Sequence, residues 1–427
     1  MTDRHQGATD VDAVGSTYSE RVIAAVRTRR QGTLAQSPHM TREPAPEVVD
    51  LTDEQLRERG GMKWTHSGVD VLPAWVAETD LAIAPVVTDA VRAAVERGDV
   101  GYPPYDDRTG LPEALAAYAE RQWRWPIDPA HVVLAGDVMA GLMLTLKVLC
   151  DNAPVVVPTP TYPPFLDIVP LAGLELVTLP LDPDATTATL DLDRVAAALA
   201  AGARTVLLCN PHNPWGRAFT RTELEGLRDV VTRYGARVVS DDIHAPLVLP
   251  GAAYLPYASL AGTADHVTTV LSASKAWNVP GLRCAQLVTG TPADAERLRA
   301  IPHVANDGVS TLGVAANLAA YRDGQPWLDA FVARLDANRG LFGELVRREL
   351  PLARRRPLEA TYLAWLDLRA YGRADPARTA LERGRVLVNE GRSFGPGGEG
   401  HVRVNVATSS ERLERIVNQL AQALVST

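Results

Sequence analysis

The sequence predicts an α/β protein in which a large domain with a mostly parallel sheet is followed by a smaller α+β domain. Over residues 84–321, short runs rich in β-branched residues alternate with helical patterns, which is typical of parallel strands covered by helices. The length of 427 residues suits two or three domains. After Tyr321 the pattern changes to a long helix, two strands and a last helix, expected near 328–350, 362–368, 402–406 and from about Ser410.

The chain before the large domain differs from it in composition. Residues 1–46 are rich in charged and small polar residues, with one short apolar stretch at 22–26, and we expect a flexible extension there. We expect the next segment to pack with the small domain. The predicted organisation is an extension at 1–46, this N-terminal segment at 47–83, the large domain at 84–321 and the small domain at 322–427.

Composition argues against several classes of partner. The net charge of -8 disfavours a nucleic-acid-binding surface, and the histidines show no metal-ligand spacing. The N-terminus lacks the apolar core of a signal peptide, and no apolar run approaches the roughly 20 residues of a membrane span. Cys150, Cys209 and Cys284 lie far apart in apolar runs, so we expect them to be reduced and buried. These features predict a cytoplasmic protein without a nucleic acid, membrane or metal partner.

One strand–loop–helix unit is unusually clear. The apolar run at 205–209 predicts a strand, and a Pro- and Asn-rich loop follows it. Thr220 and Glu223 have the spacing of a capping box that begins a helix, and Gly235 has the place of the residue that ends it. The next strand is expected at 236–240, ending at Asp241.

Chemically capable side chains follow three successive strands, of which the third is expected at 267–271. Open α/β sheets bind ligands outside the carboxyl ends of their strands. Each of these side chains alone would be explained as a turn, a helix cap or a solvated residue, but together they predict a functional site at this edge. They are Asn210 and Asn213 after the first strand, Asp241 and His244 after the second, and Ser272 and Lys275 after the third.

Three motifs carry a family resemblance. NPHNPWG (210–216), VVSDDIH (238–244) and SASKAWNVPGLR (272–283) closely resemble the class I/II aminotransferase superfamily of pyridoxal-phosphate (PLP) enzymes. The resemblance runs from Lys63 to the C-terminus. It implies fold type I, the aspartate-aminotransferase-like fold of PLP-dependent transferases, with PLP as the cofactor and a small amino acid as the substrate.

The resemblance assigns roles around the cofactor ring. Lys275 would hold PLP as a Schiff base and then move the proton at the substrate Cα. Asp241 would pair with the pyridine nitrogen and keep it protonated. Asn213 would bind the phenolic oxygen, and His244 occupies a position where many aminotransferases have a Tyr that contacts the same oxygen.

The resemblance also implies a phosphate site. Ser272, Ser274 and Arg283 fit the family's phosphate-binding pattern. Gly136, Asp137 and Val138 resemble the helix N-terminus whose backbone N–H groups bind the phosphate. Asp137 departs from the family pattern, since a carboxylate repels a phosphate unless it turns away as the helix N-cap.

Further positions match substrate and interface residues of the family. Tyr162 matches the aromatic residue that stacks on the pyridine face, where it and Asn213 would also border the substrate. Arg403 matches the arginine that binds the substrate α-carboxylate with a bidentate fork, and Ala77 lies in a segment that lines the substrate pocket in relatives. Tyr102 matches a catalytic tyrosine that reaches the phosphate from the partner subunit, which implies a homodimer with shared active sites.

Other segments resemble the cystathionine β-lyase (MalY/PatB-like) branch of C–S lyases. They are Met62–Trp64, Trp75–Asp80, Gly101–Tyr102, 159–165, Asp242–His244 and Phe394–Gly400. This likeness implies β-elimination from a cysteine S-conjugate to a thiol, pyruvate and ammonia. Thr79 and Leu81 replace the branch's usual Met and Phe, which favours an unusual and bulkier conjugate.

The shared cofactor residues leave other reactions open. An aminotransferase would use the same side chains, and so would an enzyme that decarboxylates or oxidatively deaminates an S-conjugated cysteine. A non-catalytic regulatory protein that keeps PLP is a remote alternative, because the set Asn213, Asp241, Lys275 and Arg403 is complete.

Overall fold

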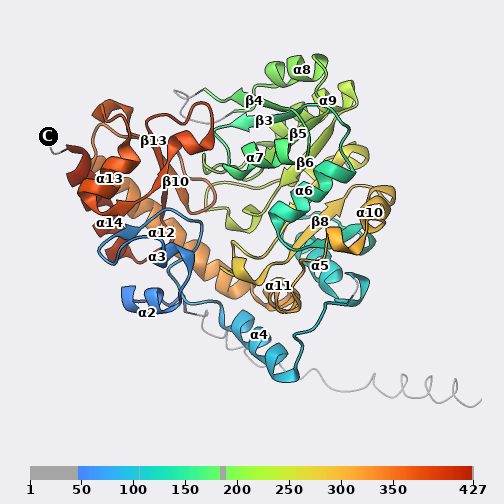
Figure 1. The fold of residues 1–427 in the computed structure, drawn as a ribbon, viewed down its shortest axis with the longest axis horizontal. Helices are drawn as coiled ribbons and strands as arrows, with labels where there is room; N and C mark the ends of the chain where they lie inside the picture. Colours follow the sequence, from blue (N-terminus) through green and yellow to red (C-terminus); the bar gives the residue numbers. More distant parts are fainter. Residues whose placement is uncertain (1–46, 105, 183–188, 426–427) are drawn as a thin grey trace, which may run out of the picture. The chain divides into compact units, whose positions relative to one another are not determined.

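The computed structural model describes residues 47–104, 106–182 and 189–425. The extension predicted at 1–46 lies outside these residues. The described chain contains a seven-stranded sheet and a four-stranded sheet (Figure 1). The predicted α/β class, with a mostly parallel large sheet and a smaller α+β part, is confirmed. The domain boundaries at residues 84 and 322 stay predictions.

The large sheet is parallel except for one strand. Its order is β2-β8-β7-β6-β5-β3-β4, and β8 runs antiparallel to both of its neighbours. The β-branched and Leu-rich runs explain why these strands are buried, except β4, which lies at the edge of the sheet and is half-buried. The bounds are β2 Val132–Ala135, β3 Val155–Thr159, β4 Leu176–Pro180, β5 Thr205–Cys209, β6 Arg237–Asp241, β7 Val267–Leu271 and β8 Ala285–Thr289.

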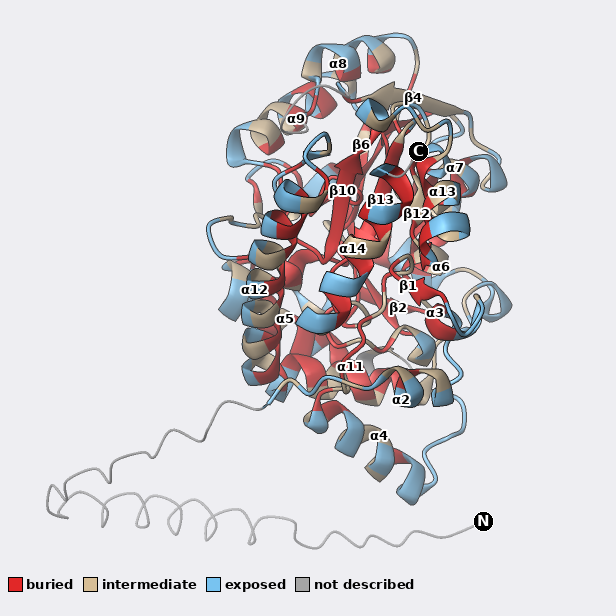
Figure 2. Cartoon of the chain, turned by 90° about the vertical axis from the view of Figure 1, so that its left-hand side faces the viewer, coloured by how far each residue is buried: buried red, intermediate tan, exposed pale blue. Residues whose placement is uncertain are grey.

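Alternate side chains of these strands enter two separate cores. Val155 and Val157 of β3 pack in one core with α6 and α7, whereas Val156 packs in the other with α8 and α9. This two-residue period places a helical layer on each face of the sheet, and Figure 2 shows buried strands beneath helices with exposed outer faces. The helices of this part are α4 Pro85–Arg97, α5 Leu111–Trp123, α6 Val138–Val148, α7 Pro164–Leu171, α8 Leu192–Ala200, α9 Arg221–Tyr234, α10 Pro292–Arg299 and α11 Thr311–Asp323.

The strand–loop–helix unit forms as predicted, with one shift. The capping box between Thr220 and Glu223 begins α9, and Gly235 ends it in the left-handed conformation at φ 59°. Strand β6 begins one residue later than expected, at Arg237, and ends at Asp241 as expected.

The smaller sheet is antiparallel, in the order β12-β13-β10-β9. The long helix begins three residues earlier than predicted, at Gln325, and α14 begins at Ser410 as predicted. This part comprises α12 Gln325–Glu349, β9 Arg354–Arg355, β10 Leu363–Asp367, α13 Pro376–Gly384, β11 Val386–Leu387, β12 Asn389–Glu390, β13 His401–Asn405 and α14 Ser410–Val425.

The segment before α4 contacts the C-terminal part of the chain. It contains α2 Asp53–Glu58, α3 Met62–Thr65 and the short strand β1 Leu72–Pro73. Strand β1 pairs in parallel with β11, and the backbone N–H of Asp80 donates to the carbonyl of Ala407. None of the helices that the structure describes could cross a membrane. The three cysteines are free; Cys209 and Cys284 are buried, but Cys150 is only half-buried, contrary to prediction, because it follows the end of α6 near the surface.

Candidate active site

A cavity of about 190 Å³ lies at the carboxyl edge of the large sheet. It is lined by residues that follow β5, β6 and β7 and by the N-terminus of α6, as the parallel topology requires. Nine of the lining residues were predicted from the sequence: Ala77, Asp137, Val138, Tyr162, Asn213, Asp241, His244, Ser274 and Lys275. The cavity is also lined by four residues without a predicted site role, Met139, Cys209, Ile243 and Pro280. They lie within or next to the motifs, but only Cys209 carries a reactive group, its thiol.

Lys275 lies in the turn after β7, and side chains hold this turn. The hydroxyl of Ser272 donates to the carbonyl of Cys284 at 2.7 Å and accepts from the backbone N–H of Ser274 at 3.1 Å. The Lys275 amine donates to the carbonyl of Ala77 at 3.1 Å. Burial lowers the pKa of Lys275 to about 8, against the opposing effect of the Glu78 carboxylate. About a tenth of this amine is therefore neutral and nucleophilic at pH 7, far more than for a lysine with the ordinary pKa of 10.5.

Asp241 ends β6 beside the cavity. Its carboxylate accepts from the backbone N–H of Ile243 at 3.1 Å. Burial raises the pKa of Asp241 to about 7, and Lys275 partly offsets this effect. The neighbouring Asp242 does not line the cavity; it accepts hydrogen bonds from the hydroxyls of Ser240 and Tyr254, and burial raises its pKa to about 7 as well.

Arg403 reaches the site from β13 of the small sheet. Its guanidinium donates to the side-chain oxygens of Asn213 at 3.0 Å and Asn389 at 2.6 Å, and to the carbonyl of Trp75 at 2.9 Å. It is buried, and burial lowers its pKa to about 10. Its Nε has no hydrogen-bond partner, and no carboxylate in the described ranges forms an ion pair with it. A buried cation without an anionic partner is costly, so this arrangement favours an anionic ligand.

His244 follows β6 of the large sheet and contacts a residue next to β10 of the small sheet. Its ring packs edge-on against Tyr362 at a centroid distance of 6.4 Å. Burial, with the nearby positive charges of Lys275 and Arg403, lowers the pKa of His244 to about 3, so the ring is neutral. Its Nδ1 is buried without a partner among the described atoms, which leaves one polar atom available to a ligand.

The N-terminus of α6 also lines the cavity. Asp137 is the N-cap of this helix, and its side chain accepts from the backbone N–H of Ala140 at 2.8 Å. The carboxylate also forms an ion pair with Arg283 at 2.8 Å. The backbone N–H groups of Val138 and Met139 belong to the first turn, where a helix supplies no carbonyl partner. This end can therefore bind an anion through backbone N–H groups, and the nearby Asp137 charge is paired.

Five predicted site residues do not line the cavity, and one of them, Arg403, reaches it through its hydrogen bond to Asn213. Ser272 is buried and hydrogen-bonds within its own turn. Gly136 is required for packing, since an added Cβ would lie 2.9 Å from the carbonyl oxygen of Gly308. Arg283 contacts Asp137 at the rim, and its side chain is 59% exposed. Tyr102 is 93% exposed and has no place in the cavity of a single chain.

Tyr162 and Ala77 both line the cavity. Tyr162 follows β3, lines the cavity and packs edge-on against Phe165 at 5.8 Å. The Ala77 carbonyl accepts from both Lys275 and the buried hydroxyl of Tyr362, a residue without a predicted role. No motif in the sequence marks Tyr362, because its contact spans 285 residues.

Comparison with known proteins identifies the family. The model of the family described as aminotransferase class I and II matches residues 76–420. The chain belongs to this family. Among curated members it is 36% identical to cystathionine β-lyase of Corynebacterium glutamicum, over 87% of this chain and 98% of that protein. It is 30% identical to cystathionine β-lyase PatB of Bacillus subtilis, over 88% and 99%.

A solved structure of this family superposes closely. It is the PLP-bound C–S lyase from Staphylococcus hominis, with a TM-score of 0.82, 25% identity, and coverage of 91% of this chain and 99% of that chain. The predicted family and fold type are confirmed. The predicted cofactor and reaction class agree with the names of these relatives.

Proposed function

We propose that this protein is a PLP-dependent C–S β-lyase that converts a cysteine S-conjugate and water to a thiol, pyruvate and ammonia. The observation that carries the proposal is a cavity-lining amine whose pKa burial lowers, together with a buried guanidinium that donates to Asn213 of the same cavity. Lys275 supplies an amine with a lowered pKa, and Arg403 supplies a cation without an anionic partner in the described chain. An amino acid has the complementary carboxylate, and the relatives named as cystathionine β-lyases supply the reaction class.

The side chains present suit PLP. Lys275 would bind its aldehyde carbon, and Asp241 would accept a hydrogen bond from the protonated pyridine nitrogen. Asn213 and His244 would contact the phenolic oxygen, for which the unpartnered Nδ1 of His244 supplies a polar atom. Tyr162 would pack on the ring. PLP, when bound, supplies an electron sink for the pair left on Cα.

The phosphate would bind where donors converge at the rim. The first-turn N–H groups of Val138 and Met139, the Ser274 hydroxyl and Arg283 are the proposed donors. Asp137 caps α6 and pairs with Arg283, so its negative charge is compensated. Ser272 is proposed to act on the phosphate site indirectly, because its hydroxyl accepts from the backbone N–H of Ser274 and fixes this residue.

The proton transfers are proposed to use a single base. Lys275 would take the proton from Cα at its Nζ, since this amine is buried and its lowered pKa favours the neutral form. The carbonyl of Ala77 would orient the amine. As the Cβ–S bond breaks, the electron pair of that bond leaves with sulfur as a thiolate, which takes up a proton.

Arg403 would orient the substrate. A planar guanidinium can bind a carboxylate through two parallel hydrogen bonds, which fixes the rotation about Cα. Because Nη2 donates to both Trp75 and Asn389, the substrate carboxylate would replace one of these two acceptors. Asn213, Asn389 and the Trp75 carbonyl hold the plane of the guanidinium. This orientation would decide that the Cα–H bond, and not the bond to the carboxylate, is broken.

We propose a homodimer in which Tyr102 completes the partner's phosphate site. Tyr102 is almost fully exposed in one chain, and Val95 and Val100 nearby are exposed apolar residues, which supports an interface at this surface. The three free cysteines support a reducing location, and we propose the cytoplasm.

The test is product identification. Purified protein with PLP is incubated with S-ethylcysteine and with bulkier S-alkylcysteines, and thiol, pyruvate and ammonia are measured. We expect the three products in equal amounts, and none with Lys275→Ala. Amino transfer to an added keto acid without thiol release would identify an aminotransferase instead, and carbon dioxide release would identify a decarboxylase.

A further inference from the structure

A short segment, residues 75–80, contacts side chains next to strands of both sheets, and its Ala77 lines the cavity; we call it the strap. Side chains from both sheets bind its backbone. The amine of Lys275 and the hydroxyl of Tyr362 donate to the Ala77 carbonyl, and Asn278 accepts from the N–H of Thr79 and donates to its carbonyl. The Ala77 carbonyl is the one described hydrogen-bond acceptor of the Lys275 amine, so the strap determines where this acceptor lies.

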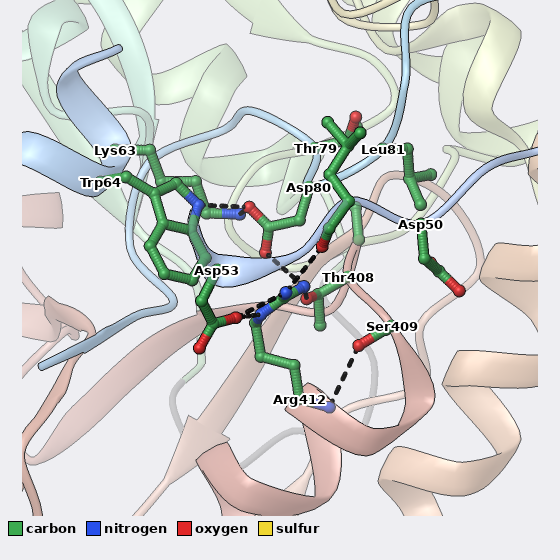
Figure 3. Close-up of polar contacts among 12 residues, drawn as sticks. Asp50, Asp53, Lys63, Trp64, Thr79, Asp80, Leu81, Thr408, Ser409 and Arg412 are labelled. Carbon is green, nitrogen blue, oxygen red and sulfur yellow. Dashed lines mark hydrogen bonds and ion pairs between the residues drawn. The ribbon is translucent and has the colours of Figure 1, made fainter. Parts of the chain in front are cut away.

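A buried charged cluster anchors the end of the strap (Figure 3). Lys63 of α3 forms an ion pair with Asp80 at 2.8 Å, and Arg412 of α14 lies 3.8 Å from the other carboxylate oxygen. The side chains of Lys63, Asp80 and Arg412 are 3%, 0% and 5% exposed. The indole N–H of Trp64 donates to Asp80 at 2.7 Å, and Arg412 is paired with Asp53 at 2.6 Å.

Lys63 contacts the strap at two points. Besides its ion pair with Asp80, its amine donates to the carbonyl of Glu78 at 3.0 Å. The strap carbonyls on either side of Ala77 are also held, because Asn405 donates to both Val76 and Glu78 at 2.7 Å. Removing one member of a buried ion pair leaves an uncompensated charge, which moves the remaining partner toward water. A change at Lys63 therefore displaces Asp80 and releases the Glu78 carbonyl.

We propose that Lys63 is a positioning residue that, through Asp80 and the strap, holds the Ala77 carbonyl against the Lys275 amine and keeps water away from that amine. The role of Lys275 in this proposal rests on the proposed function. The placement of the strap does not.

The consequence for Lys275 has a definite direction. The charged groups that act on its amine are Glu78 on the strap, Asp241 at the end of β6 and Arg403 on β13. Burial is the largest of the effects that lower the Lys275 pKa. If the strap loosens, water reaches the amine and its pKa rises toward the ordinary value.

The experiment compares Lys63→Met with the double variant Lys63→Met/Asp80→Asn in the full chain. In the double variant, Asp80→Asn removes the carboxylate that Lys63→Met leaves without its partner, so we expect the folded state to regain stability. The double variant still lacks the amine that donates to the Glu78 carbonyl, so this contact with the strap is not restored. Two controls leave the strap contacts intact. Asp70→Asn removes an exposed ion pair with Arg385 near β11, and Leu420→Ala opens a cavity in the core face of α14.

Hydrogen exchange of the protein as purified is measured by mass spectrometry. We expect the amides of Thr79 and Asp80 to exchange at least about tenfold faster in both Lys63 variants and at the wild-type rate in Asp70→Asn. We expect Leu420→Ala to lower the melting temperature about as much as Lys63→Met does. The amides of Thr79 and Asp80 should nevertheless exchange more slowly in Leu420→Ala than in Lys63→Met. Unchanged strap exchange in both Lys63 variants, or recovery of exchange together with stability in the double variant, would overturn the proposal.

The second readout is the reactivity of the Lys275 amine. After removal of any bound cofactor, the pH dependence of its acylation is followed by peptide mass spectrometry. We expect the midpoint near pH 8 to rise by about one unit in both Lys63 variants, and by nothing in the controls. An unshifted midpoint would refute the link to Lys275. Because neither readout needs cofactor or substrate, failure of the lyase assay would not affect either result.

Discussion

The role of Arg403 can be tested by a substitution that keeps the charge and removes the fork. Arg403→Lys retains a cation at the end of a flexible chain, but a lysine has no planar pair of N–H donors. In the structure the guanidinium is held by Asn213, Asn389 and the Trp75 carbonyl, and its Nε is buried without a partner. Lysine cannot satisfy all three acceptors and a substrate carboxylate together.

The expected size of the effect follows from the number of bonds lost. A hydrogen bond to a charged group contributes about 1.5–3 kcal/mol, so losing one of the two bonds to the carboxylate removes about 2 kcal/mol. Since about 1.4 kcal/mol corresponds to a tenfold change, kcat/KM should fall by about thirtyfold. Arg403→Ala removes both bonds and the charge, and should reduce kcat/KM by a further factor of about ten or more.

The assay separates substrate binding from folding. Dissociation constants are measured from the change in cofactor absorbance with S-ethylcysteine and with S-ethylcysteamine, which lacks the α-carboxylate. We expect Arg403→Lys to weaken the binding of S-ethylcysteine only, with an unchanged melting temperature. If the binding of both ligands weakens equally, or the binding of neither changes, Arg403 does not bind the substrate carboxylate. Its role would then be to pack between β13 and the strap.

Four further predictions follow from the site. Lys275→Ala should give protein without a borohydride-reducible bond to PLP, whereas wild-type protein treated with borohydride should carry the cofactor on the peptide that contains Lys275. Because only the neutral amine condenses with an aldehyde, the rate of PLP uptake by cofactor-free protein should rise with pH through about 8 and then level off; a flat profile from pH 7 to 9 would contradict the lowered pKa. Burial raises the folded-state pKa of Asp242 to about 7, so its stabilising contribution is complete below the unfolded value of 3.8 and is lost as pH rises toward 7. The melting-temperature advantage of cofactor-free wild type over Asp242→Asn should therefore shrink between pH 4 and 7, and a constant difference would argue against a protonated Asp242. Mixing Tyr102→Ala with Lys275→Ala should restore activity through hybrid dimers if Tyr102 acts across the interface, and no recovery after verified subunit exchange would place Tyr102 outside the partner's site.

Local patterns in the sequence were sufficient for the layered fold and for the residues at the strand ends. A strand buried on both faces reads as a short run of β-branched residues and leucines, as at 205–209 and 267–271, and both were predicted with their observed bounds. Since parallel strands deliver their carboxyl ends to one edge, the residues that follow them are brought together without further information. Asn213, Asp241 and Lys275 accordingly line one cavity.

Contacts between distant segments could not be derived in this way. The ion pair of Asp137 with Arg283 joins residues on different elements, and it explains how a carboxylate is accommodated where the family resemblance implies a phosphate site. Tyr102 is exposed in the single chain, so its predicted contact depends on a second copy that no pattern in one chain specifies. Ser272 carried the expected residue type, but its hydroxyl is directed to the Cys284 carbonyl.

The sequence by itself determined the order of strands and helices and the chemistry available at the carboxyl edge of the sheet, because periodicity and strand ends are properties of neighbouring residues. Only the tertiary structure decided which charges are compensated, with Lys63, Asp80 and Arg412 buried together and Arg403 buried without an acid in the described chain. The physical reason is that burial and pairing depend on segments more than 300 residues apart, as in the contact of Arg412 with Asp53. The free energy of a charged group follows from that environment and not from its place in the sequence.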